Sequence, residues 1–265
     1  MTYQAKAKYI GDVASQYDQK RASNIKWKHE LEAVQTIVAQ FDGAQSILDV
    51  PLGTGRFLEC YERDQHTVVG LDISSDMLLQ AKTKLKFNHA DYSSSVHMIV
   101  GEAEKLPLGN KSIDYVVCIR LLNWVSEQIL KDIIGEFSRV ARKGMVIGVR
   151  LQHPMKAFDF FKFGVRAVLP TRHHIVSWFN FIIRSILRFV STLKQMVVKL
   201  FFNKTKQGPR NIATGYTLHD KKNVLSLFSD LAMDVCQSIL IDTRVSYLER
   251  KVKPYMFFLL KVKDQ

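Results

Sequence analysis

Residues 46–59, with the sequence SILDVPLGTGRFLE, restrict the fold of this chain more than any other stretch. A short apolar strand, interrupted only by Asp49, leads into a tight turn at Gly53 and Gly55, and a helix opens at Arg56. Strand, glycine turn and helix in this order begin a nucleotide-type α/β fold, in which a ligand binds at the carboxyl end of the first strand. Glycine is needed in the turn because a side chain would hold the ligand away from the backbone.

The turn differs from two common nucleotide-binding fingerprints. Leu58 replaces the last glycine of G-x-G-x-x-G, and no Gly-Lys-Ser/Thr follows as it does in a phosphate loop. The stretch resembles motif I of the class I S-adenosylmethionine (SAM)-dependent methyltransferases, Asp-x-Gly-x-Gly-x-Gly. Asp49, Gly53 and Gly55 match this motif, and Pro51 replaces its first glycine.

Three later segments fit the same family in order and spacing. They are the apolar strand 68–72, the segment 98–107 with the acid-alanine pair Glu102-Ala103, and the buried strand 112–119, which precedes Arg120. An acid that ends the second strand, here Asp72, accepts hydrogen bonds from a ribose diol. In the family, the acid-alanine pair borders the adenine.

The resemblance implies that SAM is the cofactor and indicates which residues bind it. These residues are Tyr17, Asp49, Pro51, Gly53, Gly55, Arg56, Asp72, Ile73, Met77, Glu102, Ala103 and Arg120. Tyr17 has an alternative interpretation, as an aromatic side chain that packs the N-terminal segment onto the core. Ser74 or Ser75 is expected to cap the helix that follows Asp72.

Strand and helix patterns alternate along the chain and predict a parallel sheet covered on both faces. Together with the resemblance, this gives an α/β, Rossmann-like, seven-stranded, mostly parallel sheet with a helical insertion after the fifth strand. We expect an N-terminal helical cap in 1–42, the SAM-binding core in 43–150, the insertion in 151–215, and a C-terminal helix with closing strands in 216–265. Thr217 is the expected N-cap of that C-terminal helix.

The charge of the chain is concentrated in the insertion. The net charge is +13, and the segment 151–215 holds eleven lysines and arginines against one acid, Asp159. Within it, 175–203 reads as a helix with a wide apolar face and a narrow basic stripe. Its longest charge-free run, 173–183, is shorter than the roughly 18–20 residues that a membrane span requires.

Several roles for this insertion stay open. It is either a lid over the acceptor pocket, a homodimer interface, or a helix that lies in the membrane interface and is attracted to anionic lipid. Nucleic acid is disfavoured as a partner because the apolar residues are sorted to one face, whereas RNA-binding surfaces interleave basic and aromatic residues.

The composition also indicates the compartment. Cys60, Cys118 and Cys236 are far apart and fall in predicted helix or strands, so we expect buried, reduced thiols, as in a reducing cytoplasm. The N-terminus lacks the apolar core of a signal peptide. A cytoplasmic location is therefore expected, with peripheral attachment to the membrane if the insertion binds lipid.

The expected chemistry is methyl transfer. The sulfonium of SAM makes its methyl group electrophilic, so the protein mainly has to bind, orient and desolvate the reactants. His153, Tyr216 and His219 are the candidates for a base that removes a proton from the acceptor. The histidines and cysteines lack paired ligand spacing, so no metal is expected.

The preferred acceptor is a small or amphipathic molecule, with a lipid or lipid-linked compound first. The alternatives are a soluble metabolite bound under a lid, a non-catalytic SAM-fold binding module, and an RNA methyltransferase.

Overall fold

The computed structural model describes residues 9, 11–41, 43–88, 90–154, 217–246 and 251–263. The chain divides into two units, Met1–His153 with Gly215–Gln265, and Pro154–Thr214. The described residues belong to the first unit, apart from Pro154. The predicted helix 175–203 and Tyr216 lie outside the described residues.

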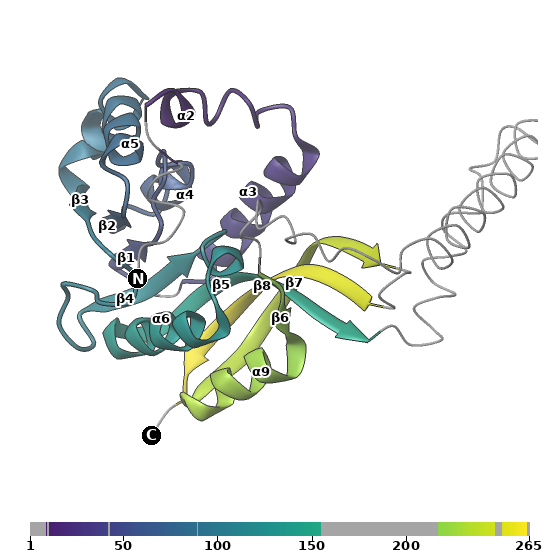
Figure 1. The fold of residues 1–265 in the computed structure, drawn as a ribbon. Coiled ribbons are helices and arrows are strands. Elements are labelled where there is room, and N and C mark those ends of the chain that lie inside the picture. The colour runs from purple at the N-terminus through teal and green to yellow at the C-terminus, as the bar shows by residue number, and fades with distance from the viewer. Residues whose placement is uncertain are drawn as a thin grey trace, which may run out of the picture. The chain divides into compact units, whose positions relative to one another are not determined.

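The first unit is built on one eight-stranded sheet (Figure 1). Its strands are β1 (Ser46–Asp49), β2 (Thr67–Asp72), β3 (Val96–Val100), β4 (Ile113–Cys118), β5 (Ala141–Pro154), β6 (His219–Asp220), β7 (Met233–Ser246) and β8 (Lys251–Val262). Seven of them follow the order β3-β2-β1-β4-β5-β8-β7, and β6 pairs with β5 beside this row. The Rossmann-like class is confirmed, and β6 is a strand beyond the predicted seven.

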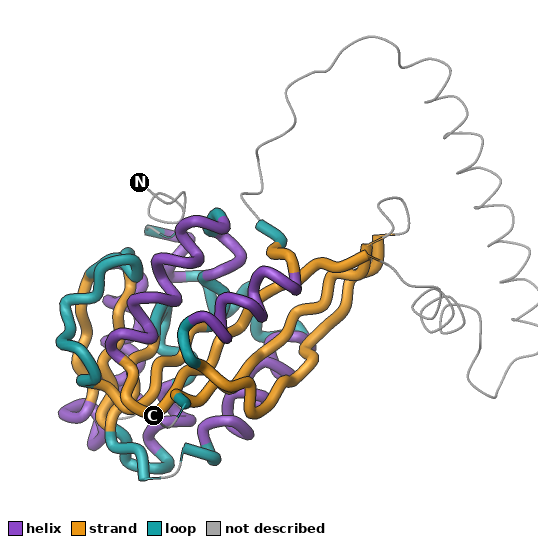
Figure 2. The backbone as a smooth tube through the Cα atoms, turned by 90° about the horizontal axis from the view of Figure 1, so that it is seen from below, coloured by secondary structure: helices purple, strands orange, loops and turns teal. Residues whose placement is uncertain are grey.

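The strands from β1 to β5 pair in parallel, and β7 and β8 pair antiparallel along their length (Figure 1). Figure 2 shows strands of the sheet running side by side, with helices packed against them. The helices are α2 (Asp12–Ser15), α3 (Ile25–Val38), α4 (Leu58–Glu62), α5 (Ser75–Asn88), α6 (Glu127–Val140) and α9 (Lys221–Asp230), with short 3₁₀ helices η1 (Ala90–Ser95) and η2 (Leu122–Trp124). Figure 1 shows α6 and α9 on one face of the sheet, and α3 and α4 on the other.

Two apolar cores, one on each face, result from the alternation of side chains along the strands. On β1, Ile47 packs with residues of α3, α4 and α5, whereas its neighbour Leu48 packs with residues of α6 and α9. On β4, Val117 and Val116 divide in the same way. Because both faces are covered, the central strands are continuous apolar runs.

Helix starts follow the expected capping chemistry at two places and differ at a third. Asn24 caps α3, and the Ser74 hydroxyl accepts from the Met77 N–H at 3.2 Å before α5. The prediction that Thr217 caps the C-terminal helix is wrong. Asp220 caps α9, because its carboxylate accepts from the N–H of Lys222 at 2.8 Å.

The cysteines are reduced, but only two of them are buried. Cys60 and Cys118 lie in the core, and burial raises the pKa of Cys60 to about 12. The expectation of a buried thiol is wrong for Cys236, which is exposed on β7. The reason is topological: β7 is the last strand of the row, so part of its surface is left uncovered.

Candidate functional site

The glycine turn after β1 has the backbone that its sequence demands. Gly53 and Gly55 have φ angles of +59° and +71°, which side chains with a Cβ rarely adopt. A Cβ at Gly55 would also lie 2.7 Å from Cδ1 of Leu58. Pro51, at the first glycine position of the motif, follows a cis peptide bond.

Asp72, at the end of β2, is bound to this turn. Its Oδ2 accepts from the Gly53 N–H at 2.8 Å, and its Oδ1 accepts from the Ser74 N–H at 2.9 Å. Burial raises the pKa of Asp72, although these backbone hydrogen bonds act in the opposite direction. A carboxylate has about four acceptor positions, so Asp72 retains acceptor capacity for a ligand.

Asp49 lies deeper than Asp72. Its side chain is 1% exposed, and its Oδ2 accepts from the Tyr61 hydroxyl at 3.1 Å. Burial raises the pKa of Asp49 well above its ordinary value, and the nearby charge of Asp72 adds to this effect, whereas the Tyr61 hydrogen bond opposes it. Asp49 therefore supports the turn from behind.

The segment that precedes α3 is fastened to the loops of the sheet. The Thr54 hydroxyl donates to Asp18 Oδ1 at 2.7 Å, and the Gly11 N–H donates to Asp76 Oδ2 at 2.6 Å. The Tyr17 ring lies 5.9 Å from that of Trp27, centroid to centroid. These contacts bring the N-terminal segment beside the glycine turn.

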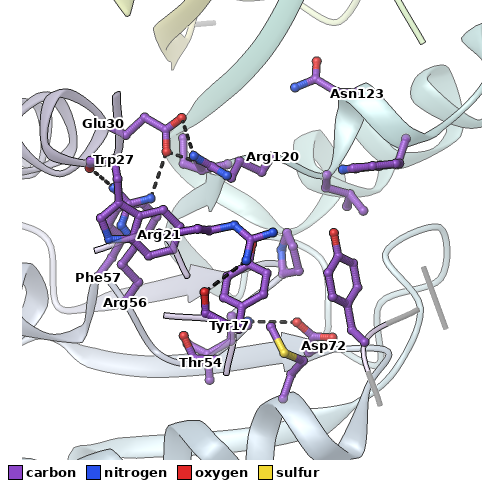
Figure 3. A pocket seen from close by; sticks show the side chains of 18 of the residues that line it. Tyr17, Arg21, Trp27, Glu30, Thr54, Arg56, Phe57, Asp72, Arg120 and Asn123 are labelled. Atoms are coloured by element: carbon purple, nitrogen blue, oxygen red, sulfur yellow. Dashed lines mark hydrogen bonds and ion pairs between the residues drawn. The ribbon is translucent and has the colours of Figure 1, made fainter. Parts of the chain in front are cut away.

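A buried acid of α3 holds two arginines. Glu30 is fully buried, and its Oε2 accepts from Arg56 Nη1 and from Arg120 Nε, both at 2.8 Å (Figure 3). Arg120 also donates to Oε1 at 3.0 Å. Burial alone would lower the pKa of Arg120, but the charge and hydrogen bonds of Glu30 outweigh it and raise the pKa. The Arg56 guanidinium stacks 3.6 Å from the Trp27 ring centroid.

These elements enclose a cavity of about 310 Å³ (Figure 3). It is lined by Tyr9, Tyr17, Arg21, Asn24, Lys26, Trp27, Glu30, Pro51, Leu52, Gly53, Thr54, Arg56, Phe57, Asp72, Ile73, Met77, Ile119, Arg120, Leu121, Asn123, Trp124, Arg244 and Tyr255. In Figure 3, Thr54 and Asp72 lie on one side of the cavity, and Arg120 and Asn123 on the other.

Some of the predicted cofactor residues line the cavity, and the others lie outside its lining. Eight of them line the cavity: Tyr17, Pro51, Gly53, Arg56, Asp72, Ile73, Met77 and Arg120. Asp49 and Gly55 lie behind the lining of the turn. Ala103 is buried in the core, and Glu102 is exposed, so the acid-alanine pair is outside the described lining.

The two predicted bases that the structure describes, His153 and His219, are not among the residues that line this cavity. His219 is buried on β6, and its Nε2–H donates to the Leu122 carbonyl at 2.7 Å. Burial lowers the pKa of His219, so its ring is neutral and serves the packing of β6. His153, near the end of β5, is half-buried and is not one of the described lining residues. Neither histidine is brought to the cavity, and Tyr216 is outside the described residues.

In the described part of the chain, no three or more His, Cys, Asp or Glu side chains are arranged to hold a metal ion. Nor does any helix among these residues have the length and apolar character needed to cross a bilayer.

Comparison with known proteins agrees with this geometry. Residues 47–144, which include the glycine turn and Asp72, match the family of methyltransferase domains. The chain contains a class I methyltransferase domain. The family match leaves out α3, β7 and β8, so part of the cavity wall of this methyltransferase domain lies outside it.

Curated relatives match the methyltransferase domain over part of their length. One is a malonyl-[acyl-carrier protein] O-methyltransferase of Hamiltonella defensa, 32% identical over 101 residues, which are 38% of this chain and 35% of the relative. Another, of the same name, from Salmonella typhimurium, is 28% identical over 144 residues, 54% of this chain and 52% of the relative. The chain thus spans about half, or less, of the length of these relatives.

Solved structures show the same fold at low identity. Magnesium protoporphyrin IX methyltransferase from Synechocystis PCC 6803, with bound SAM, superposes with a TM-score of 0.60 at 11% identity, covering 98% of this chain and 95% of that one. Geranyl diphosphate C-methyltransferase from Streptomyces coelicolor superposes with a TM-score of 0.55 at 13% identity, covering 97% of this chain and 88% of that one.

Residues that the sequence analysis missed complete the cavity of the methyltransferase domain. They include Arg21, Trp27, Glu30, Thr54 and Arg244. A signal existed for Glu30, because it falls on the same helical face as the buried Val34 and Ile37. An acid on an apolar face needs a partner. Arg244 carries no such signal, since a charged residue near the end of a strand is usually solvated.

Proposed function

We propose that this protein is a SAM-dependent methyltransferase. The observation that carries the proposal is the buried Asp72 carboxylate, bound to the backbone of the glycine turn and still open to the cavity. The fold does not need a carboxylate there for stability, since its burial is unfavourable. Buried acids with raised pKa values that line a cavity are typical of functional sites.

The residues of the cavity fit SAM by their chemistry. Asp72 accepts hydrogen bonds from the ribose hydroxyls, the glycine turn allows the cofactor to approach the backbone, and Tyr17 and Trp27 cover it from the N-terminal segment. SAM, when bound, supplies a methyl group on a sulfonium, ready for in-line transfer. The chain then has to orient the acceptor and exclude water. His153 and Tyr216 remain predictions for a base.

Calorimetric titration of Asp72→Asn with SAM tests the cofactor assignment. Loss of a charge-assisted acceptor should weaken binding about tenfold or more. The matched control is Asp230→Asn, which changes an exposed acid at the end of α9. Equal affinities of Asp72→Asn and the wild type would refute the assignment.

The acceptor we propose is a small or amphipathic molecule, with a lipid-linked compound first. The names of the curated relatives support this class, since their acceptor is malonyl carried on an acyl-carrier protein. The sequence of the insertion also supports it, because an apolar face with a basic stripe suits an anionic membrane surface. A soluble acceptor, with the insertion as a lid or dimer element, is the second candidate.

A further inference from the structure

The cavity carries more positive than negative charge. Five cationic side chains line it, against two acids, and the acids are shared. Glu30 binds both Arg56 and Arg120, and each Asp72 oxygen accepts from one backbone N–H group. The cations are Arg21, Lys26, Arg56, Arg120 and Arg244. Outside the lining, Asp242 is shared in the same way by Lys26 and Arg150.

Arg244 stands out among these cations. It is exposed on β7, and within the described residues its side chain has no ion pair or hydrogen bond. Because this unpaired guanidinium lines the cavity, it is available to an anion that enters the cavity.

Arg244 lies on a strand that is far from Asp72 in the sheet. Asp72 ends β2, whereas Arg244 is on β7, and the strands β1, β4, β5 and β8 lie between them in the sheet. Arg120, which the sequence predicts as a cofactor residue, follows β4, midway along this row, and lies on the side of the cavity opposite Asp72 (Figure 3). Arg244 therefore lines a part of the cavity that is distant from Asp72, and we assign this part to the acceptor.

We propose that the methyl acceptor is anionic, and that its carboxylate or phosphate group binds where Arg120 and Arg244 line the cavity. This inference rests on the proposed function. Bound SAM adds two positive groups, its sulfonium and its ammonium, and one negative group, its carboxylate. A neutral acceptor would thus leave an excess of positive charge in a partly enclosed space, which is costly. The planar guanidinium fork matches carboxylate and phosphate geometry.

Binding to the full chain saturated with S-adenosylhomocysteine provides the test. Calorimetric titrations would use malonate, malonamide as its neutral counterpart, inorganic phosphate, and dihexanoyl phosphatidic acid below its micelle concentration. We expect malonate or a phosphate compound to bind and malonamide not to bind. Binding of phosphatidic acid alone would identify a lipid headgroup as the source of the anion, and binding of the free anions a soluble acceptor.

Variants then locate the site. Arg244→Gln should weaken anion binding about tenfold, and Arg244→Lys should restore part of it. Lys261→Gln, which removes an exposed cation from the other end of the β7–β8 pair, should change nothing. Equal binding of the anion by Arg244→Gln and the wild type, or no anion binding at all, would overturn the inference. Failure to bind S-adenosylhomocysteine would refute the proposed function instead, so the two failures are distinguishable.

Discussion

Asp49 and Asp72 end neighbouring strands, and the fold holds both carboxylates where ionisation is unfavourable. Burial raises the pKa of each, and the charge of Asp72 raises that of Asp49 further. A fold selected for stability alone would place apolar side chains there. The unfavourable burial of a charged group is common at a ligand site, where function requires that group.

The pH dependence of stability should report on Asp49. Folded Asp49 keeps its proton at pH values above the ordinary aspartate pKa of 3.8, where the unfolded chain has lost it. Unfolding therefore releases a proton, and the free energy of unfolding contributed by this group falls as pH rises from that value to the raised pKa. Asp49→Asn removes this contribution, so its stability relative to the wild type should rise by about 1 kcal/mol or more between about pH 4.5 and about pH 8.

Urea unfolding of both proteins at the two pH values measures this difference. The contributions of the other titrating groups to the pH dependence cancel, because both proteins share those groups. Asp91→Asn, a change at an exposed acid of η1, is the control and should show no such trend. A stability difference for Asp49→Asn that stays constant with pH would contradict the burial of an unfavourable charge.

For single residues, the sequence predicts the structure best where the local backbone conformation determines which residue type fits. Gly53 and Gly55 could be predicted because their positive φ angles favour glycine over residues with a side chain. Arg244 could not, because its role depends on which other elements surround it.

α3 is the element on which the cavity depends, and two ionic clusters hold it against the sheet. Glu30 binds arginines from the glycine turn and from the end of β4, and Lys26 binds Asp242 of β7 at 3.0 Å. Burial alone would raise the pKa of Asp242, but Lys26 and Arg150 hold it below its ordinary value. The helix therefore joins three distant parts of the chain.

Glu30→Gln should loosen this helix. The amide removes the negative charge and leaves two arginines without their counter-charge in a buried place. Breaking a buried pair by changing one partner costs about 3 kcal/mol or more, and urea unfolding measures the loss. Glu32→Gln, at an exposed position of the same helix, is the matched control. Equal stability of the two variants would show that the ion pairs of Glu30 do not stabilise the position of α3.

The elements themselves could largely be predicted, because their apolar periodicity is local. α3 and β3 lie where the sequence indicates them, whereas β6 could not be foreseen. A two-residue strand has no periodicity, and it exists because His219 and Asp220 lie beside β5. The error at the cap of α9 has the same origin, since Thr217 is held instead by a hydrogen bond from its N–H to the Asn123 carbonyl at 2.7 Å.

On the scale of the whole molecule, charge is segregated along the chain. The segment 151–215 carries eleven of the basic residues against one acid, within a net charge of +13. We expect the full chain to co-sediment with anionic vesicles and not with neutral ones. This binding should weaken as salt rises, because the Debye length shortens.

The triple variant Arg184→Gln, Arg188→Gln and Lys199→Gln should lose most of this binding, at about 1 kcal/mol per cation. Neutralising three exposed lysines elsewhere, Lys131, Lys221 and Lys261, gives the same net charge and should have little effect. Equal loss in both variants would indicate attraction by total charge, and no vesicle binding by the wild type would favour a lid or dimer element.

The pairing of β5 with β6 has a consequence for how such a chain changes over evolution. Leu151 lies opposite His219, so the chain leaves the sheet and returns to it on adjacent strands. The cost of closing a loop rises only with the logarithm of its length, about 0.6 kcal/mol for each doubling. With its two ends anchored side by side, the intervening segment can be lengthened, shortened or exchanged at little expense to the sheet. New sequences and new partners can thus be acquired at this point while the sheet stays unchanged.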